Sequence, residues 1–213
     1  MRILLVDHGC CDHPHTRAHA IRAELAAFGV RASVCGPSSV PSLERQPVGM
    51  HGMHLHDVAA ASRPLLAAVR EGTAEAFLTA VAAVPARLLG LVRETARQTL
   101  AEAADACDPD AIFVVHAGIL ADLAVETGAP VVVHVAATDL TATAARPSLR
   151  RLVAAAIGSS DGVVAADEAV ADELRREWLA GDADGRCEQW AFGPGAGRRV
   201  MDACGRAAAR RRG

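Results

Sequence analysis

Short, almost continuous apolar runs alternate along this chain with stretches in which apolar residues recur every three or four positions. The continuous runs predict β-strands, and the periodic stretches predict amphipathic helices. Strands that are apolar on both faces are typical of a parallel sheet covered by helices on both sides. We predict strands at residues 2–6, 31–35, 111–116, 130–135, 161–165 and 187–192, and a weaker one within 49–58.

The predicted helices carry their own start and stop signals. The first has its apolar residues on one face and ends at Gly29, a residue type that commonly follows a helix. The pattern of residues 62–106 is helical, and Pro64 and Pro85 mark starts or kinks within it. Further helices are predicted at 118–127, 148–157 and 168–179 and from residue 196 onward, with a loop from 136 to 147.

Strand and helix alternate from end to end, which predicts one α/β domain over residues 1–213. We expect a Rossmann-like, mainly parallel sheet with helices on both faces, followed by a C-terminal helix and Arg-rich tail over 196–213. Ligands of such sheets collect beyond the carboxyl ends of the strands. Two predicted strands end in a histidine, at His116 and His134, so both side chains are candidates for a ligand site.

Composition and charge restrict the partners and the cellular location that we expect for this domain. A net charge of -3 and a pI near 6.3 argue against a nucleic-acid partner. No apolar stretch approaches the ~18 residues that a membrane span needs, and the first residues lack the features of a signal peptide. The six cysteines are scattered without a C-x-x-C pair, which is typical of reduced thiols. We therefore expect a cytoplasmic protein.

Several segments, taken in order, have residue patterns similar to those of one known family. They are the strand–helix–glycine–strand unit of residues 1–34, Asp108–Gly118, Gly128–Leu140, Ser160–Leu174 and Phe192–Ala196. Each alone is ordinary for a Rossmann-like domain. Their order and spacing resemble the N-terminal, acceptor-side half of a GT-B glycosyltransferase of the family-four kind, which transfers sugars from nucleotide donors with retention of configuration.

The resemblance also implies roles for particular residues. It implies catalytic positions at His134 and His116, and substrate contacts at Gly9, His13, Arg17, Thr138 and Asp139. His134 would then touch the transferred sugar or the acceptor. Retaining transfer in this family relies on the donor's own phosphate, so neither histidine is expected to be the sole base. The alternative for both is a structural histidine bonded to a nearby backbone carbonyl.

Three departures from the family pattern qualify these expectations. The usual diglycine before the first helix is replaced by Asp12 and His13, and an aspartate there would repel a diphosphate. Asp167 replaces a serine, and the chain ends soon after the segment that resembles the hinge. We therefore expect an acceptor-binding half that has no cofactor of its own. It would act with a donor-binding partner chain that brings the nucleotide sugar to a small-molecule acceptor.

Two alternatives remain open alongside a fragment of a longer transferase. The chain is a non-catalytic remnant that binds a small molecule or protein, or it binds a metal through its histidines and cysteines. His15 and His19 share a helical face at a spacing that can hold zinc. Other donors lie in 8–13 and at His51, His54, His56 and Asp57, but the spacing fits no standard zinc module, so we predict no metal site.

Overall fold

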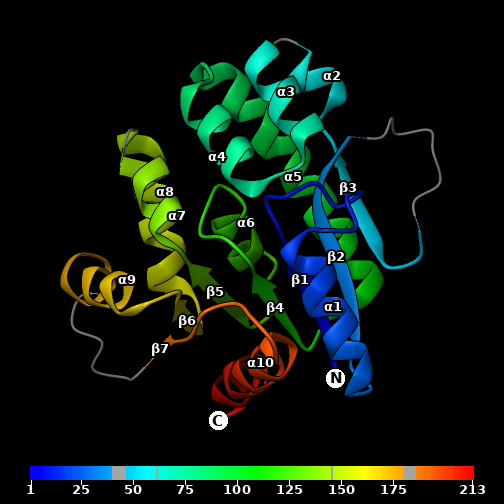
Figure 1. Cartoon of the computed structure of the whole chain (residues 1–213), viewed down its shortest axis with the longest axis vertical. Coiled ribbons are helices and arrows are strands. Elements are labelled where there is room, and N and C mark those ends of the chain that lie inside the picture. The colour runs from blue at the N-terminus through cyan, green and yellow to red at the C-terminus, as the bar shows by residue number, and fades with distance from the viewer. Residues whose placement is uncertain (40–46, 61, 145, 180–185) are drawn as a thin grey trace.

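A seven-stranded, all-parallel sheet forms the centre of the protein, as a computed structural model shows for residues 1–39, 47–60, 62–144, 146–179 and 186–213 (Figure 1). The strands follow the order β3-β2-β1-β4-β5-β6-β7. This confirms the predicted Rossmann-like α/β class. The strands are β1 (Arg2–Val6), β2 (Arg31–Ser38), β3 (Met50–His54), β4 (Ala111–Val114), β5 (Val131–Val135), β6 (Gly162–Ala165) and β7 (Cys187–Gln189).

Helices connect these strands and cover both faces of the sheet. In the described part of the chain no helix is long and apolar enough to cross a membrane. The helices are α1 (Arg17–Ala27), α2 (His56–Ala59), α3 (Arg63–Glu71), α4 (Ala74–Ala83), α5 (Ala86–Cys107), α6 (Ala121–Glu126), α7 (Ala137–Ala144), α8 (Pro147–Ser159), α9 (Glu168–Glu173), the π-helical turn η1 (Leu174–Trp178) and α10 (Ala196–Arg212).

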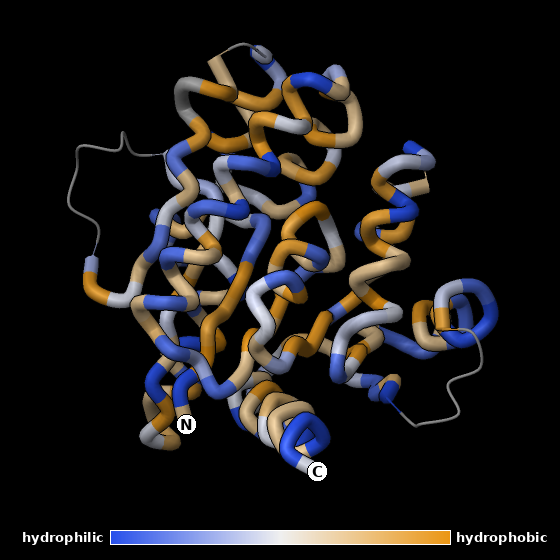
Figure 2. The backbone as a smooth tube through the Cα atoms, turned by 180° about the vertical axis from the view of Figure 1, so that it is seen from behind, coloured by the Kyte–Doolittle hydropathy of each residue, from blue (hydrophilic) through white to orange (hydrophobic). Residues whose placement is uncertain are grey.

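Alternate residues of each strand enter separate cores on the two faces, as the pleat of a strand requires. On β1, Ile3 and Leu5 pack in the core beneath α1 and α10. Leu4 and Val6 pack in the opposite core, with α5, α6 and α8. Figure 2 shows the apolar strands enclosed between these helices. The continuous apolar runs of the sequence therefore reflect a sheet buried on both faces.

The arginines at the end of α10 hold it at the amino ends of the strands, where both termini lie (Figure 1). Arg211 forms an ion pair with Asp161, just before β6, and donates to the carbonyl of Gly128, just before β5. Arg210 donates to the carbonyl of Asp161. The Arg-rich tail is thus attached to its own sheet, on the side away from the carboxyl ends of the strands.

The helical pattern over 62–106 is confirmed, with Pro64 at the start of α3 and Pro85 just before α5, but one further break was not predicted and one predicted loop was wrong. The region 62–106 breaks at Gly72, whose positive φ of 78° ends α3, while the hydroxyl of Thr73 accepts from the amide of Ala76 to begin α4. The predicted loop after β5 instead contains α7. Its third residue, Asp139, accepts from the amide of Ala136 just before the helix, a bond that stabilises a helix start.

The strand order reverses direction between β1 and β4, so the loops that follow these two strands diverge and leave a crevice. On the other side of β1, Gly36 of β2 lies directly against the loop after β1. A Cβ at this position would lie 2.7 Å from the carbonyl oxygen of Asp7 and 2.9 Å from that of Gly9. Both neighbours are backbone atoms, so this close approach fixes one wall of the crevice.

Gly36→Ala is expected to destabilise the protein by about 2 kcal/mol, because backbone must move to admit the methyl group. The matched control is Gly90→Ala in the exposed face of α5, where a Cβ meets nothing within 4 Å. That change is expected to stabilise the protein by about 1 kcal/mol through helix propensity. Urea unfolding measures both, and equal stability of the two variants would contradict the proposed close packing at Gly36.

Candidate functional site

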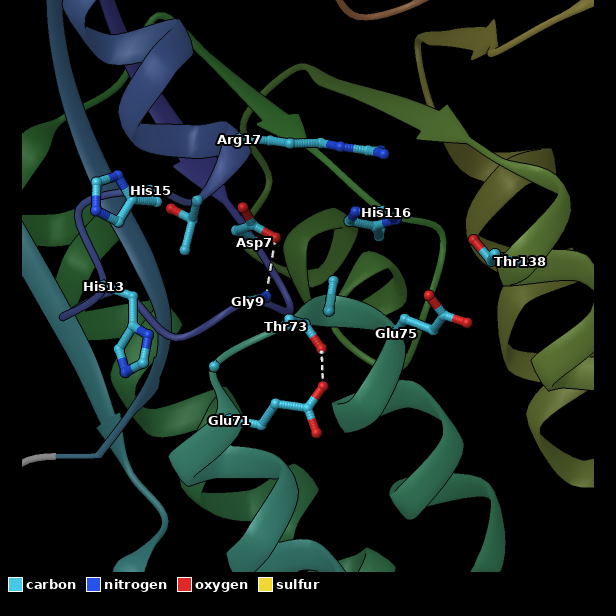
Figure 3. A pocket seen from close by; sticks show the side chains of 13 residues that line it. Asp7, Gly9, His13, His15, Arg17, Glu71, Thr73, Glu75, His116 and Thr138 are labelled. Atoms are coloured by element: carbon cyan, nitrogen blue, oxygen red, sulfur yellow. Dashed lines mark hydrogen bonds between the residues drawn. The ribbon is translucent and has the colours of Figure 1, made fainter.

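A pocket of about 420 Å³ occupies this crevice at the carboxyl ends of β1 and β4 (Figure 3). Its walls are the loop after β1, the start of α1, the junction of α3 with α4, and residues that follow β4 and β5. It brings together five of the residues that the sequence singled out, Gly9, His13, Arg17, His116 and Thr138. Asp139 lies directly behind His116, whereas His134 is not part of the pocket wall.

His116 and Asp139 form a hydrogen-bonded pair at the back of the pocket. Nδ1 of His116 lies 3.0 Å from Oδ1 of Asp139, and Oδ2 accepts from the amides of Ala117 at 3.1 Å and Ala136 at 2.9 Å. Burial raises the pKa of Asp139, but the bonds from His116 and the two amides outweigh it and hold that pKa below its ordinary value.

The ionised carboxylate of Asp139 fixes the tautomer of His116. A carboxylate only accepts, so Nδ1 of His116 must carry the hydrogen, which leaves the lone pair of a neutral ring on Nε2. His116 is only 7% exposed, and within the described residues Nε2 has no hydrogen-bond partner. Because His116 lines the pocket, it presents a single oriented base to whatever the pocket binds.

Asp7, directly after β1, occupies the start of α1. Its carboxylate accepts from the amide of Gly9 at 2.9 Å and from that of Ala18 at 3.2 Å, and the residue is only 2% exposed. The amino end of a helix is where phosphates commonly bind, because its amides point outward. Here a built-in carboxylate already uses that position, so α1 is a poor phosphate site.

Two further carboxylates come from the junction of α3 with α4. Glu71 accepts a hydrogen bond of 2.9 Å from the hydroxyl of Thr73, and Glu75 follows on the first turn of α4. Figure 3 shows both on the wall opposite Arg17. With Asp7, the pocket holds three carboxylates against one arginine. Its surroundings therefore favour hydrogen-bond donors, such as hydroxyl groups or amines, over phosphates.

His8 supports His116 from behind as a neutral ring. Its Nε2 accepts from the amide of Leu120 at the start of α6, and its Nδ1 has no partner among the described residues. Burial, together with repulsion from His116 when that ring is protonated, lowers the pKa of His8 to about 3. The ring fits because position 118 is glycine, where a Cβ would collide with His8 and Leu78.

His134 lies outside the pocket in an aromatic cluster. Its Nδ1 donates to the carbonyl of Val115 at 3.1 Å, and its ring centroid is 4.1 Å from that of Phe192. Phe192 in turn packs beneath the guanidinium of Arg17, 5.2 Å from the ring centroid. His134 is 0% exposed, and burial, with repulsion from His116 when that ring is protonated, lowers the pKa of His134 to about 4. In this arrangement Phe192 separates His134 from the pocket.

Asp12 does not line the pocket, although the family resemblance implied that it would face a bound diphosphate. Its carboxylate accepts from the hydroxyl of Ser38 and the amide of Ser39, each at 2.7 Å, at the end of β2. The charge that disfavours a diphosphate is therefore that of Asp7. Sequence reasoning missed Asp7, Glu71 and Glu75; the available signals were an aspartate directly after a strand and the Gly72–Thr73 helix break.

The histidines and cysteines that the structure describes do not gather into a metal site. Within the described residues, no group of three or more metal-binding side chains is arranged around one point. Nε2 of His19 lies 2.7 Å from the carbonyl oxygen of Cys11, and Nε2 of His51 lies 3.3 Å from the thiol of Cys107. The side chains of His56 and Asp57 lie outside what the structure describes.

Comparison with known proteins finds the fold and no sequence family. No protein-family model and no curated protein sequence matches this chain. A sucrose-phosphate synthase structure from Thermosynechococcus elongatus aligns over 100% of both chains, with a TM-score of 0.59 and 13% identity. UDP-GlcNAc 2-epimerase from Neisseria meningitidis aligns with a TM-score of 0.50 and 17% identity, over 89% of this chain and 46% of its own length. The chain thus has a Rossmann-like fold of the GT-B type.

The buried neutral histidines make stability depend on pH. His134 has a folded pKa of about 4, below its ordinary value, so the unfolded state binds a proton first as the pH falls below about 6.5. Its contribution to stability is present above that pH and is lost toward pH 4, by about 2 kcal/mol between pH 7 and pH 5.

The variant His134→Asn keeps a donor for the carbonyl of Val115 but cannot titrate. We expect its free energy of unfolding to fall about 2 kcal/mol less than that of the wild type between pH 7 and pH 5. Urea unfolding at both pH values measures this difference. The exposed variant His15→Asn serves as control and keeps the wild-type pH dependence. An unchanged pH dependence in His134→Asn would show that His134 is not held neutral.

Proposed function

We propose that this chain is the acceptor-binding part of a glycosyltransferase, in which the pocket binds a hydroxyl-bearing small molecule and His116 takes its proton. The observation that carries the proposal is the buried His116–Asp139 pair at the pocket wall, in which Nε2 of His116 has no partner among the residues that the structure describes. A base acting on a hydroxyl needs a free lone pair, a fixed ring orientation and a group that stabilises the protonated ring. Asp139 fixes the orientation of the ring and stabilises its protonated form.

The charges of the pocket support an acceptor rather than a nucleotide. Asp7, Glu71 and Glu75 accept hydrogen bonds from hydroxyl groups and repel a diphosphate, and Asp7 already caps α1. Among the described residues, Arg17 is the one arginine in this wall. The donor sugar is therefore supplied by a second domain or partner chain that faces the carboxyl ends of the strands.

The structural comparisons are compatible with acceptor binding by this chain and donor binding by a separate unit. One neighbour is named as a sucrose-phosphate synthase, and the other was determined with UDP-GlcNAc bound. This chain corresponds to 46% of the length of the epimerase. On our proposal, the site of transfer forms where the pocket meets a separate donor-binding unit of the same fold class.

His116 makes a single displacement the simplest chemistry. The proton of the acceptor hydroxyl moves to Nε2 while its oxygen bonds to the anomeric carbon, and the bond from that carbon to the diphosphate breaks. Such a displacement inverts the configuration at the anomeric carbon. The proposal departs here from the retaining chemistry implied by the sequence resemblance, because retaining transfer of that kind relies on the donor's own phosphate rather than on a base from the protein.

The test combines the chain with the product of the adjacent gene, a nucleotide sugar and a panel of hydroxylated small molecules. We expect transfer, followed by mass spectrometry, with an inverted anomeric centre in the product by NMR. His116→Ala is expected to lower kcat by about a hundredfold to ten-thousandfold, because the proton acceptor is lost.

The control for this test is His51→Ala, since His51 lies on β3 beside Cys107 and outside the pocket. It is expected to keep full activity. Transfer that survives in His116→Ala would remove the proposed base, and a retained configuration would exclude the single displacement. Failure of every partner and donor to support transfer, with small molecules still bound, would favour a binding protein without catalysis.

A further inference from the structure

An apolar groove runs beside the pocket, between α4 and α7, with a volume of about 630 Å³. It shares two residues with the pocket, Glu75 and Thr138, so the two spaces meet at these side chains. Beyond them the groove is lined by alanines, two threonines and Leu78. The groove therefore continues from the place where His116 presents its base, and it becomes apolar beyond that point.

The positions that line the groove belong to one face of each helix. On α4 they recur at the spacing of a helical face, at Glu75, Leu78, Thr79, Ala82 and Ala83. The opposite wall is Ala137, Thr138, Thr141 and Ala142 of α7. The hydroxyl of Thr141 donates to the carbonyl of Ala137, so its polar group is already used within the helix. Small side chains on both helices leave the space between them open.

Arg146, which lies immediately before α8, bonds to the end of α4, the helix that forms one wall of the groove. Its guanidinium donates to the carbonyl of Val84 at 2.7 Å and makes longer contacts with the carbonyls of Val81 and Ala82. These carbonyls end α4, where a cation is also favoured by the helix dipole. The end of α4 is thereby attached to the segment that joins α7 to α8. The groove is thus a built feature of the fold.

We infer that the groove binds the apolar body of the acceptor whose hydroxyl lies at His116. This inference rests on the proposed function and adds the class of substrate, which is an alcohol or phenol with a bulky apolar group rather than a free sugar. The continuity of groove and pocket at Glu75 and Thr138 supports one molecule in both. A cavity of this size matches the apolar part of a drug-sized ligand.

Binding of 4-alkylphenols with ethyl, butyl and hexyl chains tests the inference, with Kd measured by calorimetry on the whole chain. Each methylene buried in the groove is expected to tighten binding by about threefold. Ala142→Phe fills the groove from α7, and Ala83→Phe fills it from an exposed position on α4. Both variants are expected to lose the dependence on chain length while 4-ethylphenol still binds within about twofold of the wild-type Kd.

Ala144→Phe is the matched control, because Ala144 is exposed on α7 and lies outside the groove. It is expected to keep the wild-type dependence on chain length. A Kd that does not change with chain length, or that changes equally in the blocked variants, would overturn the inference. So would a dimer seen by sedimentation in the wild type and lost in Ala142→Phe, which would assign the groove to a second copy.

These outcomes are separable from those of the proposed function. The binding series needs no donor, partner chain or turnover, and it does not depend on His116 as a base. Chain-length dependence without glycosyl transfer would leave the groove assigned and the catalytic proposal refuted. Transfer to acceptors without any dependence on chain length would support the catalytic proposal and refute the assignment of the groove.

Discussion

The carboxylate of Asp139 joins the ring of His116 to the backbone that follows β4 and β5. It lies fully buried at the start of α7 and accepts three hydrogen bonds, from the ring of His116 and from the amides of Ala117 and Ala136. A buried charge is tolerated only when such partners replace water. Asp139 therefore ties the carboxyl ends of β4 and β5 together, and the same bonds determine which nitrogen of His116 faces the pocket.

The remainder of the pocket follows from the topology of the sheet. The reversal of strand order between β1 and β4 opens the crevice, and Gly36 lets β2 approach the loop that carries Asp7. Asp7 and Asp139 are both buried aspartates next to helix starts, yet their roles differ. Asp7 occupies the amino end of α1, which makes it a poor phosphate site, whereas Asp139 orients the ring of His116.

Sequence reasoning reached the sheet and the position of His116, because continuous apolar strands are a strong local signal. It treated His116 and His134 alike, since both end an apolar run. The structure separates them: His116 lies two residues past the end of β4 and reaches the pocket, whereas His134 is within β5. His134 points to the face beneath α1 and α10, where Phe192 covers it. That contact joins residues far apart in the chain, which no local pattern encodes. Glu71 and Glu75 were missed for a similar reason, because only the break at Gly72 brings them to the pocket.

Nitrogen NMR of His116 tests the central claim most directly, because the two ring nitrogens report where the hydrogen resides. In the neutral ring of the wild type we expect a hydrogen on Nδ1 and a bare Nε2, as the bond to Asp139 requires. In Asp139→Asn this preference should disappear, while the neighbouring His8 keeps its own hydrogen on Nδ1. A neutral His116 ring that carries its hydrogen on Nε2, or one that exchanges freely between the two tautomers, would contradict the role assigned to Asp139.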